Sequence, residues 1–185
     1  MTVAGQVAYQ GAPGAFGEEA CRTFLPGWQP LAQPSFAAVV EAVQEGVAER
    51  GMLPLRNSAA GDVPGVEALI RDSGLAVLSR HRLPVRMHLL GLPGASLATV
   101  GRVASHPMAL AQCRKWLDAS GLETDEAANT AVAAQALVAS GDRSRAVLAS
   151  AFAAELYGLE ILRRDVHDLD DNATTFAVLA REVNE

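Results

Sequence analysis

Hydrophobic and polar positions alternate along the chain in short blocks that switch between strand-like and helix-like spacing. Residues 6–9 read as a strand, which the glycine- and proline-rich residues 11–14 bring to an end. Residues 36–43 place apolar side chains at i, i+3, i+4 and i+7, the spacing of one helix face, and Ser35 is placed to cap that helix. The chain therefore opens as a strand followed by helices.

The remaining blocks continue this alternation to the end of the chain. Further helices are expected at 17–25, 64–73, 106–120, 130–140 and 151–157, and further strands at 51–55, 75–79, 87–92, 100–104, 146–149 and 175–180. Ser105, Asn129 and Ser150 stand where N-caps are expected. Strands that alternate with helices favour a largely parallel sheet covered by helices on both faces.

Composition agrees with this picture and excludes some partners. Half of the 185 residues are hydrophobic but only 5% are aromatic, so alanine, valine and leucine must supply the core. With 21 acidic and 15 basic residues the net charge is −6, which argues against nucleic acid as a partner. A local group of basic side chains and helix N-termini could still bind a small anion.

The two cysteines and the absence of apolar runs bear on the expected compartment. Cys21 and Cys113 lie far apart and form no CxxC motif, which favours two reduced, buried thiols in a cytoplasmic protein. No apolar run approaches the ~20 residues of a membrane-spanning helix. The first five residues lack the pattern of a secretory signal. We therefore expect no membrane partner.

Four loops stand at strand ends or helix starts, where unpaired backbone N–H groups can hold anions. They are residues 11–17, 57–61, 105–107 and 129–130. Taken singly, Ser105 and Asn129 are more simply read as ordinary N-caps, although a cap and an anion site can share one helix terminus.

Six motifs in one order give the chain a family resemblance. They are G-A-P-G-A-F-G at 11–17, P-L-R-N-S-A-A-G at 54–61, S-H-P-M-A-L-A-Q-C at 105–113, N-T-A at 129–131, A-E-L-Y-G-L at 154–159 and N-A-T-T-F at 172–176. Each motif alone is weak, but together they span about residues 6–180. In this order and spacing they resemble the catalytic domain of prephenate dehydratases.

The resemblance implies an α/β fold of two lobes. Each lobe would hold a mixed, mainly parallel sheet flanked by helices, similar to periplasmic binding proteins of the two-crossover kind (type II). Lobe one would comprise residues 1–82 and 167–185, and lobe two residues 83–166. The family's ligand would lie in a cleft between the lobes, at the carboxyl ends of strands.

The resemblance also implies an activity, the decarboxylating dehydration of prephenate to phenylpyruvate in phenylalanine biosynthesis. This is a carbon–oxygen lyase reaction that needs no metal or organic cofactor. Thr174 would be the catalytic hydroxyl, a donor rather than a free acid. Phe176 is expected to pack beneath the site. The substrate-binding residues implied are Arg56, Asn57, Ser58, Gly61, Ser105, His106, Asn129, Thr130, Thr175 and Phe176. The family also implies a homodimer or higher homo-oligomer.

The chain departs from the family pattern at several of these positions. Thr175 replaces an arginine and Arg56 replaces a glutamate, which suggests that the cation has moved from one edge of the site to the other. This hypothesis requires Arg56 to face Thr174. The other departures are Ala15, Gly17, Asn129 and Met87.

Three alternatives remain open from the residues. The substrate could be arogenate, or the chain could be a related enzyme that decarboxylates prephenate without aromatising it, although the retained Thr174 and Asn57 count against the second. A non-catalytic module that binds a small carboxylate is also compatible with the fold. The family's usual C-terminal ACT domain, which binds phenylalanine, has no counterpart before Glu185, as expected for either a short enzyme or a truncated chain.

Overall fold

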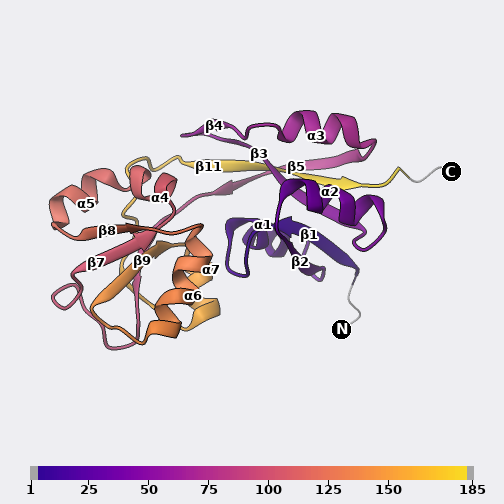
Figure 1. The fold of residues 1–185 in the computed structure, drawn as a ribbon. Coiled ribbons are helices and arrows are strands. Elements are labelled where there is room, and N and C mark those ends of the chain that lie inside the picture. The colour runs from indigo at the N-terminus through magenta and orange to yellow at the C-terminus, as the bar shows by residue number, and fades with distance from the viewer. Residues whose placement is uncertain (1–3, 183–185) are drawn as a thin grey trace. The chain divides into compact units, whose positions relative to one another are not determined.

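Two mixed sheets organise the structure, a computed structural model that describes residues 4–182 (Figure 1). The described residues divide into two compact units. Unit 1 holds Phe16–Pro84 together with the chain before Pro13 and after Asp170, and unit 2 holds Pro13–Ala15 and Val85–Asp170. The chain thus passes from unit 1 to unit 2 after Pro84 and returns after Asp170.

Unit 1 is built on a sheet in which the last of the described strands lies between two earlier ones. Its elements are β1 (Gln6–Gln10), α1 (Phe16–Phe24), β2 (Gln29–Gln33), α2 (Phe36–Gln44), β3 (Arg50–Asn57), β4 (Gly61–Asp62), α3 (Val66–Ser73), β5 (Ala76–Pro84) and β11 (Ala173–Ala180). The strand order is β2-β1-β3-β11-β5, with β4 paired to β3. Strand β1 is parallel to β2 and β3, whereas β11 is antiparallel to both β3 and β5.

Each face of this sheet has its own core. Helices α2 and α3 pack on one face, where they contact Ala177 and Leu179 of β11. Helix α1 packs on the other face, where it contacts Phe176 and Val178. Because successive side chains of a strand point to opposite faces, Thr174 belongs to the α1 face and Thr175 to the α2/α3 face.

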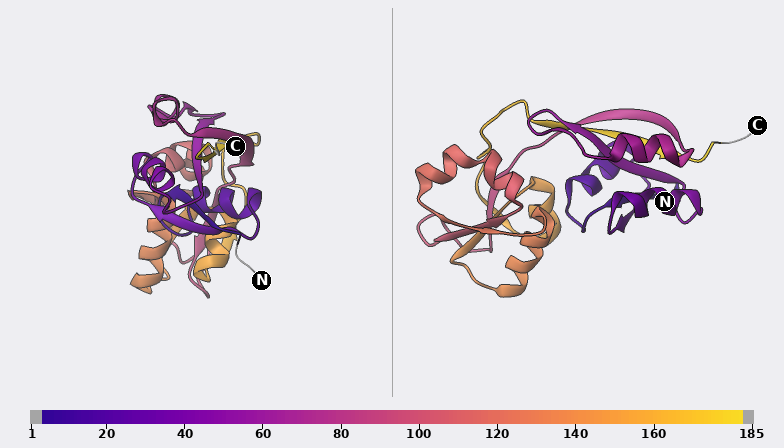
Figure 2. Two further views of the ribbon diagram at one scale, coloured as in Figure 1. Left: turned by 90° about the vertical axis from the view of Figure 1, so that its right-hand side faces the viewer. Right: turned by 45° about the horizontal axis from the view of Figure 1, so that its top comes forward.

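Unit 2 repeats the design with a five-stranded sheet (Figure 2). Its elements are β6 (His88–Gly91), β7 (Arg102–Ser105), α4 (Pro107–Gln112), α5 (Arg114–Ser120), β8 (Glu123–Glu126), α6 (Thr130–Ser140), β9 (Arg145–Ala149), α7 (Ala151–Tyr157) and β10 (Glu160–Arg163). The strand order is β10-β6-β9-β7-β8. Strand β7 is parallel to β8 and β9, so the carboxyl ends of these three strands meet at one edge of the sheet.

The α/β class with two mixed sheets is confirmed, and antiparallel pairs take a larger share than predicted. Strand β11 runs antiparallel to both of its neighbours, and β6 runs antiparallel to β9 and β10. Strands β2, β8 and β10 were not predicted. All three lie at sheet edges, where one side of the strand faces solvent and apolar alternation is weak.

Two details of the predicted helices are wrong. The single helix expected over residues 106–120 is two helices that meet at Cys113, whose backbone leaves helical geometry. The N-cap of the first is His106, whose ring accepts a hydrogen bond from the Met108 N–H, and not Ser105. Ser105 is fully buried and instead donates to the Leu148 carbonyl at 2.7 Å, which ties β7 to β9. The caps predicted at Ser35, Asn129 and Ser150 are confirmed.

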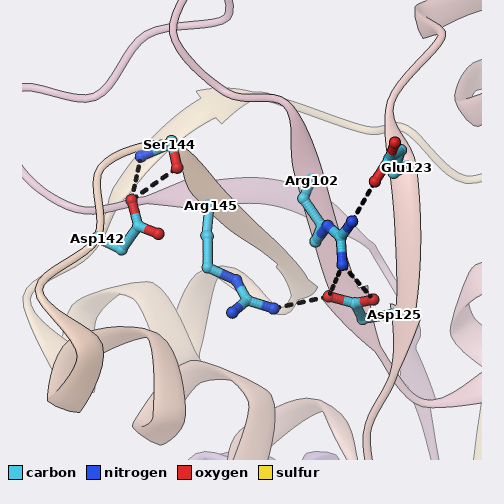
Figure 3. A network of polar contacts seen from close by, with 6 residues as sticks. All are labelled: Arg102, Glu123, Asp125, Asp142, Ser144 and Arg145. Carbon is cyan, nitrogen blue, oxygen red and sulfur yellow. Dashed lines mark hydrogen bonds and ion pairs between the residues drawn. The ribbon is translucent and has the colours of Figure 1, made fainter.

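An ion-pair network joins the amino-terminal ends of the three parallel strands of unit 2 (Figure 3). Arg102 and Arg145 are direct neighbours in the register of β7 and β9, where two like charges would repel. Asp125 of β8 accepts from both arginines, at 3.2 and 2.6 Å, and Arg102 also pairs with Glu123. The polar edge strand β8 therefore supplies the acidic side chains that neutralise the arginines of β7 and β9.

Two buried histidines hold together the segments that enter and leave unit 2. The ring of His88 accepts a hydrogen bond from the Asp165 N–H at 3.0 Å, and the ring of His167 accepts one from the Met87 N–H at 3.3 Å. A ring nitrogen can accept only when it is unprotonated, so both contacts require that nitrogen to be free of a proton. Burial lowers the pKa of His88, and the charges of Arg164, His167 and Arg86 act in the same direction against the opposing effect of Asp165.

The free energy of unfolding is therefore expected to fall as the pH drops below about 6.5, the ordinary pKa of histidine. In that range the unfolded chain binds a proton at His88 more readily than the folded protein does. The stabilisation that His88 contributes is therefore fully present above the pKa of the unfolded chain. It is lost as the pH falls toward the lower pKa of the folded protein. One such group changes the unfolding free energy by at most about 1.4 kcal/mol per pH unit. Urea unfolding between pH 5.5 and 7.5 measures the slope, and His88→Gln should flatten it. An equal slope in both proteins would show that His88 is not responsible.

Candidate active site

A hydrogen-bonded group of polar side chains lies where β3 ends and β11 begins. Asn57 and Thr174 are direct partners in the register of these strands. The Asn57 amide Nδ2 donates to Thr174 Oγ1 at 3.0 Å and to Asn172 Oδ1 at 2.9 Å. Thr174 and Asn172 are buried, with 9% and 3% of their surface exposed. Residues from distant parts of the sequence thus form one network within unit 1.

The turn after β3 fixes the other end of the Asn57 side chain. Its Oδ1 accepts hydrogen bonds from the backbone N–H groups of Ala59 and Ala60, each at 2.9 Å. Such an asparagine turn is a common way to stabilise the chain as it leaves a strand. It explains why asparagine stands at this position, and it leaves both amide protons for Thr174 and Asn172.

Ser58 joins the two strands and has little hydrogen-bonding capacity left over. Its hydroxyl accepts from the Ala173 N–H at 2.9 Å and donates to the Asp171 carbonyl at 3.3 Å, and its own N–H donates to the Ala173 carbonyl. The Arg82 guanidinium also donates to the Asp171 carbonyl, at 3.0 Å. Because the proton of the Ser58 hydroxyl is used within the protein, its observed role is to anchor the start of β11.

Arg56 does not replace a missing cation beside Thr174. It is the cross-strand partner of Thr175, so both side chains belong to the face of the sheet opposite to Asn57 and Thr174. The Arg56 side chain is 68% exposed and pairs with Asp62 of β4 at 3.4 Å. Positions 56 and 175 are thus cross-strand neighbours. The glutamate and arginine that the family pattern has at these two positions would face one another on that same side of the sheet. The hypothesis that the charge moved across the site is wrong, because neither position faces the Thr174 hydroxyl.

Phe176 and Gly61 frame the network without adding polar groups to it. Phe176 is 3% exposed and packs in the core under α1, as expected of a residue beneath the site. Gly61 has a φ of +87° and open space where a side chain would begin. A side chain at Gly61 would therefore strain the backbone without a steric clash.

In unit 2 the predicted site residues gather at the carboxyl edge of β7, β8 and β9. Ser105 and His106 follow β7, and Asn129 and Thr130 begin α6 after β8. Asn129 caps α6 through a hydrogen bond from the Val132 N–H at 2.7 Å. Since His106 Nδ1 accepts from the Met108 N–H, the neutral ring carries its proton on Nε2 as a donor. This edge therefore presents a helix N-terminus and a histidine donor, groups that suit a carboxylate.

Two residues with hydrogen bonds between distant segments, one in each unit, were not among the predicted site residues. Asn172 was used only as a motif position, yet it hydrogen-bonds Asn57 directly. Tyr157 donates to the Pro13 carbonyl and accepts from Gln135 at 2.8 Å, and its ring lies 2.8 Å from where a side chain at Gly14 would begin. Both lie in motifs that carried the family resemblance, which was the signal available in the sequence.

Metal-ligating side chains, cysteine thiols and long apolar helices add little to the chemistry of residues 4–182. No group of three or more histidine, cysteine, aspartate or glutamate side chains is arranged there to hold a metal ion. Burial raises the pKa of both Cys21 and Cys113 to about 12, so neither thiol ionises readily at neutral pH. No described helix is long and apolar enough to cross a membrane.

Comparison with known proteins gives a consistent family. The family model for prephenate dehydratase matches residues 7–184. A bifunctional N-acyl-homoserine lactone acylase/prephenate dehydratase of Komagataeibacter europaeus is 43% identical over 95% of this chain and 62% of its own length. Arogenate dehydratase 1 of Petunia hybrida is 40% identical over 96% of this chain and 42% of its own length. The chain thus spans about half the length of the curated relatives it matches.

Solved structures agree with the fold. The structure of GqqA, described as a novel type of quorum quenching acylase, is 42% identical with a TM-score of 0.90, covering 97% of this chain and 65% of its own. Prephenate dehydratase of Arthrobacter aurescens, solved in complex with L-Phe, is 25% identical with a TM-score of 0.85, covering 97% of this chain and 61% of its own. A nutrient-binding protein of Burkholderia cenocepacia bound to methionine shares the fold alone. It is 11% identical with a TM-score of 0.50, and the match covers 95% of this chain and 84% of that protein.

Proposed function

Because the chain belongs to the prephenate dehydratase family, we propose that it converts prephenate to phenylpyruvate with loss of carbon dioxide and water. The observation that carries the proposal is the Thr174 hydroxyl. It is buried, and among residues 4–182 its one hydrogen-bond partner is the Asn57 amide, which donates to it. A hydroxyl that accepts this bond keeps its own proton for a substrate.

The reaction breaks two bonds, and the protein has to assist mainly one of them. The bond from the ring to its carboxylate breaks as carbon dioxide leaves, and its electron pair enters the ring. The bond from the ring to its hydroxyl breaks as that pair enters, so the ring becomes aromatic and the departing oxygen gains negative charge. The oxygen leaves as hydroxide, which takes a proton from solvent to become water. A Thr174 proton directed at that oxygen would stabilise the charge as it develops. Threonine serves here as an oriented donor, because its hydroxyl is a very weak acid.

We propose that the two compact units are the two lobes of the family fold, and that unit 2 contributes substrate contacts. Ser105, His106, Asn129 and Thr130 gather at one sheet edge with the N-terminus of α6. Such groups are suited to a carboxylate of the substrate. Of these, Ser105 is the weakest candidate, because its buried hydroxyl already donates to the Leu148 carbonyl.

The assay is direct. Purified protein incubated with prephenate should form phenylpyruvate, which is followed by its absorbance in alkali, and a parallel reaction with arogenate should report phenylalanine. Consumption of prephenate without phenylpyruvate would favour a non-aromatising decarboxylase. Saturable binding of prephenate without turnover would favour a non-catalytic module that binds a small carboxylate.

A second candidate function is hydrolysis of N-acyl-homoserine lactones, an activity named for one relative, while a solved relative is described as a quorum quenching acylase. One observation favours it. Ser79 Oγ lies 2.9 Å from His81 Nε2 on β5, and the imidazole stacks on Phe24 at 4.6 Å. In the tautomer with its proton on Nδ1, His81 can accept the serine proton as the hydroxyl attacks a carbonyl.

If Ser79 acts as the nucleophile and His81 as its base, Ser79→Ala should lower the rate of homoserine lactone release from an N-acyl substrate by at least about 10²-fold. The same variant should leave turnover of prephenate unchanged, since Ser79 lies outside the Asn57 network. An acylase rate that survives the substitution would exclude Ser79 as the nucleophile. No release by the unsubstituted protein would exclude the activity.

We further propose that the protein acts in phenylalanine biosynthesis, in the cytoplasm and as a homodimer or higher homo-oligomer. The pathway rests on the family and on its dehydratase relatives. The compartment rests on the two buried free cysteines, which suit a reducing environment. Light scattering coupled to size-exclusion chromatography tests the assembly, and a monomeric mass at working concentration would contradict it.

A further inference from the structure

The Asn57 amide can take only one orientation. Its Oδ1 faces the backbone N–H groups of Ala59 and Ala60, each at 2.9 Å. A backbone N–H can donate but never accept, so oxygen must be the atom that faces these two groups. The amide nitrogen, with its two protons, must then face Thr174 and Asn172. Hydrogen positions in the network follow from this one constraint.

The orientation of the Asn57 amide determines the direction of the Thr174 hydroxyl proton. Oγ1 receives an Asn57 proton at 3.0 Å, so the hydroxyl acts as the acceptor in that bond. A threonine hydroxyl carries a single proton, which here cannot lie along the line to Asn57. Throughout the part of the chain that the structure describes, no other group hydrogen-bonds the Thr174 hydroxyl. The proton is therefore directed away from the network and is available as a donor.

Asn172 closes the network from the other side. Its Oδ1 accepts the second Asn57 proton at 2.9 Å, and its side chain is buried. The residues on either side of it are held by Ser58, which binds the Asp171 carbonyl and both backbone groups of Ala173. Asn172 is thus fixed at its backbone and fixes the plane of the Asn57 amide in turn. Without that acceptor the amide would have one proton unpaired in a partly buried place.

We propose that Asn172 is a positioning residue for the dehydration step, acting through Asn57 on the Thr174 hydroxyl. By holding one Asn57 proton it keeps the other on Thr174 Oγ1, and so keeps the threonine proton directed at the departing hydroxyl. This assignment rests on the dehydratase function proposed above. Nothing in it requires Asn172 to contact the substrate.

The test compares an acceptor-free variant with one that keeps the acceptor. Asn172→Leu should lower kcat for prephenate at least about 10-fold while KM changes less than about threefold, because orientation is lost but binding is not. Asn172→Asp retains an oxygen acceptor for Asn57 and should stay within about fivefold of the unsubstituted kcat. If Asn172→Leu does not fold, the Asn172→Asp result decides alone, and a loss larger than fivefold overturns the proposal.

A double-mutant cycle supplies the readout that a purely structural role would not give. In a Thr174→Ala background, Asn172→Leu should change kcat by less than about twofold, since its effect passes through the missing hydroxyl. An equal loss in both backgrounds, or a loss seen only in KM, would overturn the assignment and leave the dehydratase function in place. If the unsubstituted protein forms no phenylpyruvate from prephenate, the proposed function fails and this assignment fails with it.

Discussion

Replacing Thr174 with alanine is expected to lower kcat for prephenate by about 10²–10³-fold, the usual loss when one preorganised donor to a developing anion is removed. The Thr174 hydroxyl is the donor whose proton the described network leaves available, and it sits in a buried place where water is a poor substitute. KM should change little, because the bond strengthens only as the hydroxyl departs. Steady-state formation of phenylpyruvate measures both constants.

Thr174→Ser is the matched control for this substitution. Serine keeps the hydroxyl and its contact with Asn57 but loses the methyl group that restricts its rotamer, so most of the activity should remain. Thermal unfolding should show that both variants keep the fold. A Thr174→Ala protein that retains turnover within a few-fold of the original would exclude the donor role.

Replacing Phe176 with alanine is expected to cost about 3–5 kcal/mol of unfolding free energy, which is the usual cost for a buried phenylalanine. The ring is 3% exposed and packs in the core that β11 shares with α1, together with Val7, Tyr9, Cys21, Met52, Leu83 and Val178. Truncation would leave a cavity directly behind the first residues of β11. Urea unfolding monitored by circular dichroism measures the loss.

Leu78→Ala provides the control on the neighbouring strand. Leu78 lies in β5 with 51% of its surface exposed, so its truncation should cost less than about 1 kcal/mol. If Phe176→Ala were no more destabilising than Leu78→Ala, Phe176 would not be a core residue of unit 1. A large fall in stability with kcat preserved at low temperature would separate its packing role from the chemistry.

The sequence alone identified the parts of the fold that carry strong patterns. Strands buried on both faces were predicted within a few residues, as at β1 and β9. So were the helix α2, which has one apolar face, and the capped, alanine-rich helix α6. Strands β2, β8 and β10 were missed because an edge strand needs no apolar alternation. Strand β8, with the sequence Glu-Thr-Asp-Glu, is held by the backbone of β7 and by arginines on β7 and β9.

The candidate site shows a second limit of sequence reasoning. Asn57 and Thr174 could be named because each lies in a family motif, and the structure joins them in one network. That Arg56 and Thr175 face away from this network depends on the pairing of two strands more than a hundred residues apart. A change that seemed to remove a cation from the site is instead a change in a cross-strand pair on the other face.

The position of β11 has a consequence for how the chain assembles. It lies between β3 and β5, and it is the last of the described strands to leave the ribosome. The sheet of unit 1 therefore cannot close until Ala173–Ala180 has been made, whereas residues 85–170 of unit 2 are contiguous and can fold earlier. Until then β3 and β5 each have an unpaired edge, so nascent chains are most prone to aggregate in this interval. Because Thr174 lies on β11, its hydrogen bond with Asn57 can form only after β11 has paired with β3.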